Sequence, residues 1–198
     1  MFNETQNRIR SMALIHEQLY QSKNLAMINF KEYVQNLLNN LLYSYEVDPD
    51  AIQLSINIED VSMAIDTAIP CGLIINELVS NSLKYAFPRS RKGKILIGLQ
   101  SENGNGGPIS SKISSKARRS HGPNSGKARE SISVEALGHS HFTLIVSDNG
   151  VGFPKDLDFR NTESLGLQLV VELSEQLRGS IELDRKGGTS FRIKFEEF

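Results

Sequence analysis

Two polar motifs constrain the fold of this chain, because a helix and a strand end must meet if the motifs form one site. The first, Asn-Glu-Leu-Val-Ser-Asn-Ser-Leu-Lys-Tyr at 76–85, has the spacing of a helix with a polar stripe. The second, Asp-Asn-Gly-Val-Gly at 148–152, follows the apolar run 142–147 and is typical of a tight turn after a strand. A glycine at 166 and a Gly-Thr pair at 188–189 follow in the same order along the chain.

The period of the apolar residues predicts helices mixed with strands. Asn29, three residues before Glu32, predicts a capping box. Pro70 is expected in the first turn of its helix, where a missing N–H costs nothing, and Pro88 should end that helix. The helices are expected at about 9–19, 30–45, 70–86 and 165–177, and the strands at 52–58, 94–100, 142–147, 181–184 and 190–195.

This order of elements predicts an α/β (α+β) two-layer sandwich, in which a mixed sheet carries helices on one face and a bundle helix precedes it. Residues 102–140 do not fit the sandwich. They are rich in Gly, Ser, Asn, Lys and Arg and have few aliphatic side chains, so a disordered basic insertion between two strands is expected. The insertion could contact an anion or a partner, or it could be a dispensable solvated loop.

Charge and composition narrow the function classes. The formal net charge is −1 and the pI is about 6.4, so no global attraction to nucleic acid is expected. Cys71 is the single cysteine; it cannot form an internal disulfide, and a small buried hydrophobe is the simpler interpretation. No apolar run is long enough for a membrane segment.

The first motif places Glu77, Asn81 and Lys84 on one helix face. An Asn amide oxygen is a neutral hard ligand for Mg²⁺, a lysine can meet phosphate charge, and Tyr85 adds a hydroxyl or an aromatic wall. An exposed polar stripe is the alternative for an isolated helix. Glu77 could act as a base, or as a residue that orients a nucleophile, or it could only organise metal-bound water.

The second motif places a carboxylate, Asp148, at a strand end, where it needs donors such as the exocyclic amine of adenine. Gly150 and Gly152 allow a tight turn and a close approach to a flat base. A plain hairpin turn is the alternative. The polar stretch 153–163 suits a lid, and the following helix start favours phosphate.

The order ELVSNSLKYAF, DNGVGFP, SLGLQLV and GGTSF resembles the N, G1, G2 and G3 boxes of the ATP-binding domain of two-component sensor histidine kinases. The chain is most similar to the subgroup with the second type of dimerisation and phosphoacceptor segment, within the GHKL ATPase superfamily. The resemblance covers nearly the whole chain except the basic insertion. One departure is Ser164, where many relatives have another glycine, so the lid hinge is expected to be stiffer.

The resemblance implies ATP and Mg²⁺ as ligands and transfer of the γ-phosphoryl group to a histidine. Asn81 would hold Mg²⁺ and Asp148 would bind the adenine amine. The further residues implied are, on the phosphate side, Lys84, Tyr85, Gly166 and Leu167 and, around the base, Gly150, Gly152 and Thr189. A related GHKL ATPase, a Ser/Thr kinase of anti-sigma type, and a non-catalytic ATP-binding module that titrates intact kinases stay open as alternatives.

The resemblance also implies a domain organisation. Residues 1–24 would be the last helix of a truncated dimerisation and phosphoacceptor hairpin, and residues 25–198 the ATP-binding catalytic domain. The family's acceptor histidine precedes this helix, so it is not expected in the chain, and His16 is expected in a packing or surface role. The implied partners are a phosphoacceptor hairpin, a response regulator and a second copy in the full-length context. The expected location is the cytoplasm, or the cytosolic end of a longer sensor.

Overall fold

The computed structural model describes residues 13, 27–88, 91–101 and 140–197. His16, the expected bundle helix apart from residue 13, and nearly all of the basic insertion therefore lie outside the described residues. The insertion was expected to reach residue 140, but Ser140 already belongs to a strand.

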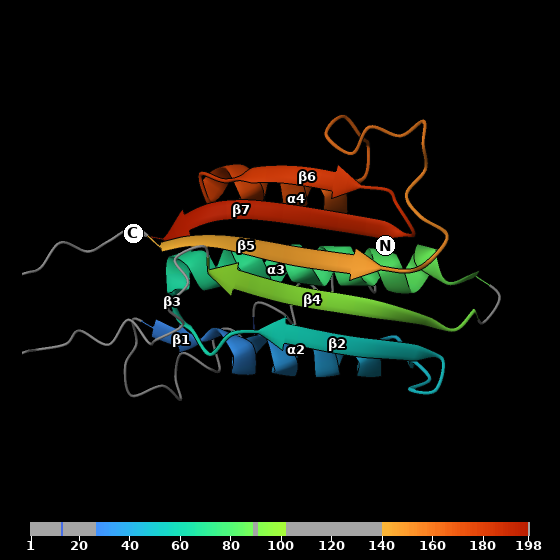
Figure 1. Ribbon diagram of the computed structural model, residues 1–198, viewed down its shortest axis with the longest axis horizontal. Helices are drawn as coiled ribbons and strands as arrows, with labels where there is room; N and C mark the ends of the chain where they lie inside the picture. Colours follow the sequence, from blue (N-terminus) through green and yellow to red (C-terminus); the bar gives the residue numbers. More distant parts are fainter. Residues whose placement is uncertain (1–12, 14–26, 89–90, 102–139, 198) are drawn as a thin grey trace, which may run out of the picture.

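A five-stranded mixed sheet forms one layer (Figure 1). Its order is β2-β4-β5-β7-β6, in which β2 runs parallel to β4 and each of the other neighbours is antiparallel. The strands expected from the sequence are confirmed, with bounds of Ile52–Ile58 for β2, Gly93–Ser101 for β4, Ser140–Asp148 for β5, Ser180–Asp184 for β6 and Thr189–Glu197 for β7. A short antiparallel pair, β1 (Met27–Asn29) with β3 (Ser62–Ala64), is separate from this sheet.

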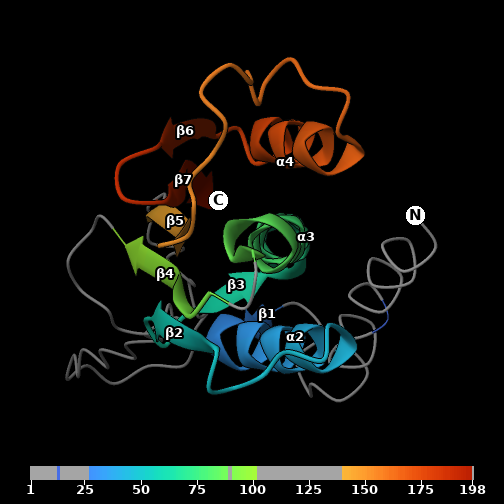
Figure 2. The same cartoon turned by 90° about the vertical axis from the view of Figure 1, so that its right-hand side faces the viewer.

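Three helices cover one face of the sheet, as Figures 1 and 2 show, so the two-layer sandwich is confirmed. They are α2 (Phe30–Ser44), α3 (Ile65–Asn81) and α4 (Leu165–Gln176). Asn29 caps α2, because its side chain accepts a hydrogen bond from the backbone N–H of Glu32 at 3.0 Å. Within the described residues, no helix combines the length and the apolar character that a membrane crossing needs.

The central helix α3 differs from its prediction at both ends. It begins at Ile65, so the placement of Pro70 in the first turn was wrong: Pro70 lies inside the helix and is buried. A proline there removes one helical hydrogen bond, but burial of α3 along most of its length against both neighbouring helices and the sheet outweighs that loss. The predicted single helix to residue 86 also changes at Asn81 into a π-helix, η1 (Ser82–Ala86).

The start of α3 is capped by a residue from the other end of the fold. Ala64 at the N-cap has no side-chain oxygen. Glu197 at the end of β7 replaces it, because its Oε1 accepts a hydrogen bond from the Ala64 N–H at 2.6 Å. Burial raises the pKa of the Glu197 carboxyl, and the hydrogen bonds from Ala64 and Thr67 oppose that rise. Strand β7 and helix α3 are therefore joined at the end of α3 that lies far from Asn81.

Candidate functional site

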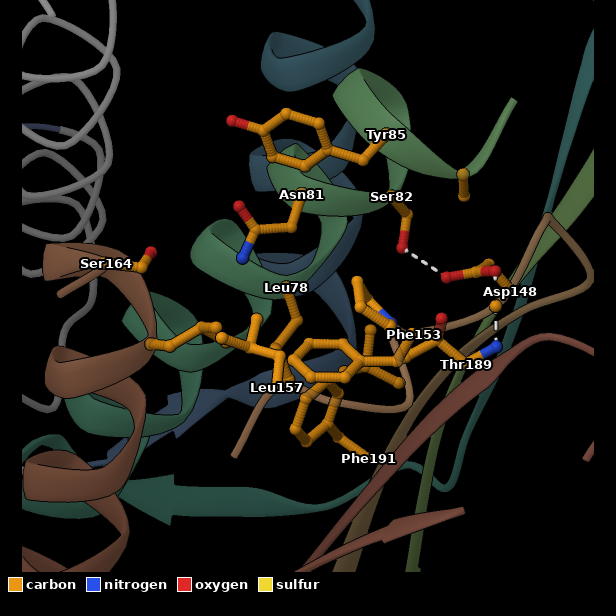
Figure 3. A pocket seen from close by; sticks show the side chains of 15 residues that line it. Leu78, Asn81, Ser82, Tyr85, Asp148, Phe153, Leu157, Ser164, Thr189 and Phe191 are labelled. Carbon is orange, nitrogen blue, oxygen red and sulfur yellow. Dashed lines mark hydrogen bonds between the residues drawn. The ribbon is translucent and has the colours of Figure 1, made fainter. Parts of the chain in front are cut away.

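A cavity of about 350 Å³ lies where both sequence motifs meet (Figure 3). Its walls come from α3 and η1, the end of β5, the connection 149–164, the start of α4 and the start of β7. The lining residues are Leu78, Asn81, Ser82, Tyr85, Ala86, Val146, Asp148, Gly152, Phe153, Pro154, Leu157, Ser164, Leu167, Thr189 and Phe191.

The helix wall of the cavity is offset from the predicted polar stripe. Leu78, Asn81, Ser82 and Tyr85 line the cavity, and their spacing of three, four and seven positions puts them on one face. Of the three residues expected to share that face, Asn81 is there, whereas Glu77 and Lys84 are not among the lining residues.

Glu77 and Lys84 have other surroundings. Glu77 is buried, with 6% of its surface exposed, and its Oε1 accepts a hydrogen bond from the side-chain amide of Asn76 at 3.4 Å. The ammonium nitrogen of Lys84 lies 5.8 Å from the ring centroid of Tyr45, a residue that follows α2. Burial argues against the exposed polar stripe at Glu77.

Three donors converge on the carboxylate of Asp148. Its Oδ1 accepts hydrogen bonds from the backbone N–H of Gly150 at 2.9 Å and of Thr189 at 3.3 Å. Its Oδ2 accepts one from the hydroxyl of Ser82 at 2.9 Å. Figure 3 shows the bonds with Ser82 and Thr189 at one end of the cavity. Asp148 is 7% exposed, so the donors balance the burial of its charge and fix its orientation.

The two glycines of the turn after β5 have different roles. Gly152 lines the cavity and has a φ of 87°, a conformation that favours glycine. Gly150 does not line the cavity; a Cβ there would collide with the backbone carbonyl and the Cβ of Ala86. The next residue, Val151, donates its N–H to that same carbonyl at 3.0 Å. Gly150 therefore lets the turn pack on the end of η1.

A second aromatic wall, made of phenylalanines rather than the Tyr85 expected from the sequence, was not predicted. Phe153 and Phe159 each meet Phe191 of β7 edge to face, with centroid distances of 5.9 and 5.4 Å. Phe153 and Phe191 line the cavity beside Leu157. The sequence signal was the alternation of apolar residues along β7, which places Phe191 on the covered face of the sheet, although it does not reveal what packs there.

The connection 149–164, which includes the stretch 153–163 expected to be a lid, is attached to strand β6 and the turn after it. The guanidinium of Arg160 donates to the backbone carbonyl of Ile181 at 2.6 Å. The guanidinium of Arg185 donates to the carbonyl of Leu157 at 3.0 Å and lies 5.5 Å from the ring centroid of Phe153. These contacts hold the middle of the connection against the sheet.

The start of α4 forms the opposite wall. Ser164 at its N-cap and Leu167 in its first turn line the cavity, whereas Gly166 is buried beside them without lining it. The side chain of Ser164 makes no capping hydrogen bond. The N–H groups and the dipole at a helix start favour an anion, so this wall suits a phosphate group.

The chemistry of a metal at this site is limited by the donors present. Among the described residues, no three His, Cys, Asp or Glu side chains gather closely enough to hold a metal ion. On the helix wall, the amide oxygen of Asn81 is a hard donor that could serve as a ligand. One protein ligand is compatible with Mg²⁺, which keeps waters and takes its other ligands from phosphate oxygens.

Two family models match the chain. Residues 66–197 match the family described as histidine kinase-, DNA gyrase B- and HSP90-like ATPases. Residues 1–45 match a family described as histidine kinase. The first match covers both motifs and every residue that lines the cavity.

Curated relatives are sensor kinases. The blue-light-activated histidine kinase 2 of Erythrobacter litoralis is 24% identical over 146 residues, which are 74% of this chain and 32% of that protein. The sensor histidine kinase PdtaS of Mycobacterium tuberculosis is 26% identical over 199 residues, covering 96% of this chain and 31% of that protein. The chain thus spans about a third of the length of these relatives.

Solved structures share the fold. The histidine kinase domain of the Erythrobacter litoralis EL346 blue-light-activated kinase superposes with a TM-score of 0.72 at 19% identity, covering 97% of this chain and 78% of that one. The histidine kinase AdeS of Acinetobacter baumannii superposes with a TM-score of 0.53 at 17% identity, covering 96% and 75%. At these identities the likeness concerns the fold alone.

Proposed function

The chain belongs to the family of histidine kinase-, DNA gyrase B- and HSP90-like ATPases, and we propose that it binds ATP with Mg²⁺ and donates the γ-phosphoryl group to a histidine in a two-component phosphorelay. The match of residues 1–45 to a histidine kinase family and the sensor kinases among its relatives support the kinase branch over the other branches.

The observation that carries this proposal is the carboxylate of Asp148 at the end of the cavity. It is buried and fixed by three donors, so it offers a ligand an oriented acceptor. An adenine amine is a matching donor. Gly152 and Thr189 stand beside it at the base end, and Phe153, Leu157 and Phe191 offer an apolar surface to the flat base.

The other end of the cavity suits the phosphates. Asn81 would supply one oxygen ligand to Mg²⁺, which neutralises phosphate charge when it is bound with the nucleotide. The start of α4, with Gly166 and Leu167, would meet the phosphates through its N–H groups. Tyr85, of which 67% is exposed, stands at the opening, and Lys84 would contribute charge by turning from the ring of Tyr45.

Glu77 is the proposed base or orienting residue for the nucleophile. It lies one helical turn before Asn81, in a buried position that favours a defined orientation. The acceptor histidine would come from a phosphoacceptor hairpin outside these residues, on the same or another kinase. We further propose that residues 25–198 are the catalytic domain, that residues 1–24 lead into it from such a hairpin, and that the full-length protein is a cytoplasmic or cytosol-facing dimer that signals to a response regulator.

Calorimetric titration with ATP and Mg²⁺ tests the proposal. Wild type should bind, and Asp148→Asn should lose about 1.5–3 kcal/mol of binding free energy, because a charge-assisted hydrogen bond is replaced by a neutral group. Asp156→Asn is the matched control, since Asp156 is exposed on the connection and does not line the cavity. Absence of binding to wild type, or an equal loss in both variants, would refute the assignment.

A further inference from the structure

Ser82 is the one hydroxyl that contacts the carboxylate of Asp148 among the hydrogen bonds of the described residues. It is the first residue of η1, is 8% exposed and lines the cavity. Its partner lies 66 positions away in the sequence. Figure 3 shows the Ser82 hydroxyl directed at Asp148 from the helix wall.

The direction of this hydrogen bond determines which acceptor atoms the polar end of the cavity presents to a ligand. A carboxylate can only accept, so the Ser82 proton points at Oδ2 of Asp148, and the serine oxygen keeps only lone pairs for other partners. The two backbone donors are both occupied by Oδ1. The polar end of the cavity therefore presents adjacent acceptors, Asp148 Oδ2 and Ser82 Oγ, to whatever binds there.

Adjacent acceptors select a donor-rich group. A 6-amino purine offers two N–H bonds at one nitrogen, whereas a purine with a carbonyl at that position would bring a third acceptor against them. A site that hydrogen-bonds a ligand group discriminates strongly against analogues that lack the group, because its own buried polar atoms are then left unpaired.

Ser82 is not needed to hold η1 against the turn after β5. The N–H of Val151 donates to the Ala86 carbonyl at 3.0 Å, and Gly150 packs closely against Ala86. Neither of these contacts involves the Ser82 hydroxyl. The hydroxyl thus orients a carboxylate whose surroundings are already assembled.

We propose, on the basis of the function proposed above, that Ser82 is a positioning residue that sets specificity for the 6-amino group of the base by fixing Oδ2 of Asp148. Removing the hydroxyl lets that oxygen turn away from the ligand and removes the neighbouring acceptor. The affinity lost should therefore depend on the amino group of the ligand.

Two nucleotides and two variants test this by calorimetry in the presence of Mg²⁺. The nucleotides are ADP and purine riboside 5′-diphosphate, which lacks the 6-amino group. Wild type should prefer ADP, and Ser82→Ala should reduce that preference about tenfold, as expected for one hydrogen bond to a charged group. Ser174→Ala is the matched control, because Ser174 is a buried serine of α4 that donates to the Val170 carbonyl at 2.7 Å, away from the cavity.

Each outcome is decisive. An equal loss for both nucleotides in Ser82→Ala, or no loss for either, overturns the inference while the ATP assignment stands. A wild type that binds neither nucleotide overturns both. Thermal unfolding monitors the fold; if Ser82→Ala does not fold, Ser82→Cys carries the same test, since its thiol has a similar shape and is a weak donor.

Discussion

Glu77 is the residue proposed above to act on the nucleophile. It does not line the cavity, yet it is buried and adjoins Asn76, which lies on the same helix. A general base must lie within hydrogen-bond reach of the proton that it removes, or one water away from it. That distance decides between a residue that acts on the nucleophile and one that only organises its neighbours.

The variant Glu77→Gln separates these roles. As a base or orienter, Glu77 should influence transfer more than binding, so the variant should keep its ATP affinity and lose phosphotransfer by roughly 10²–10⁴-fold. The measurement supplies a phosphoacceptor hairpin in trans and follows binding and transfer separately. If Glu77→Gln transfers phosphate at the wild-type rate, Glu77 has only a structural role and the proposed base or orienting role is wrong.

At the scale of residues, the sequence indicated the position of Asp148 at a strand end, whereas it grouped the helix residues only in part as the structure does; the roles of all of them stay predictions. Asp148 was identifiable because a carboxylate that ends an apolar strand needs donors. Ser82 was missed because its partner is remote in sequence. Helical spacing groups Glu77, Asn81 and Lys84, but it cannot tell which flank of that stripe meets the cavity. The offset toward Leu78 and Ser82 is set by packing of α3 against α2, α4 and the sheet.

At the scale of elements, the sequence did not predict the short pair of β1 and β3 or the two ends of α3. The sequence contains no signal for η1, a rare kind of turn, whose Ala86 carbonyl accepts a hydrogen bond from Val151 of another segment. The start at Ile65 was also missed, since Glu197, which accepts from the N–H of the N-cap residue Ala64, is 133 positions away. Strands were easier to predict, because buried and exposed residues alternate along them and the sequence shows the same alternation of apolar and polar residues.

The cap at the start of α3 makes stability depend on pH. Burial raises the pKa of the Glu197 carboxyl, so the folded chain holds this proton more tightly than the unfolded chain. The contribution of this protonated carboxyl to the free energy of unfolding is fully present below a pH of 4.5, the ordinary pKa of the group. It is lost as the pH rises through the higher pKa of the folded chain. Denaturant unfolding of wild type and Glu197→Gln across this range should show wild type losing stability relative to the variant as pH increases. If wild type instead gains stability relative to Glu197→Gln as the pH increases, the prediction is wrong.

At the scale of the whole molecule, the sandwich separates its two ends. The cavity lies at the end of β5 that carries Asp148, whereas Ser101 of β4 pairs with Phe142 at the other end of the same ladder. Strand β4 therefore ends, and β5 begins, at neighbouring positions far from the cavity along β5.

Replacing residues 103–138 by a four-residue turn should leave the sandwich and its nucleotide affinity intact. The shorter closure should stabilise the fold by roughly 2 kcal/mol, because loop-closure entropy rises with the logarithm of length. Denaturant unfolding and calorimetry measure the two quantities. A Gly/Ser replacement of the original length is the control for the basic side chains; loss of nucleotide binding in both variants would show that the insertion serves the site.

The Glu197 cap has a mechanical consequence. Strand β7 starts at Thr189, whose N–H holds Asp148, and ends at Glu197 on the first turn of α3. Helix α3 then spans about 25 Å, the length of 17 residues at 1.5 Å each, back to Asn81. At that end, Asp148 accepts hydrogen bonds both from Thr189 of β7 and from Ser82, the residue that follows α3. Strand β7 and helix α3 are thus linked at both ends. We therefore expect a force applied at the start of α3 to act both on the hydrogen bond with Glu197 and, along the helix, on Asn81 at its other end.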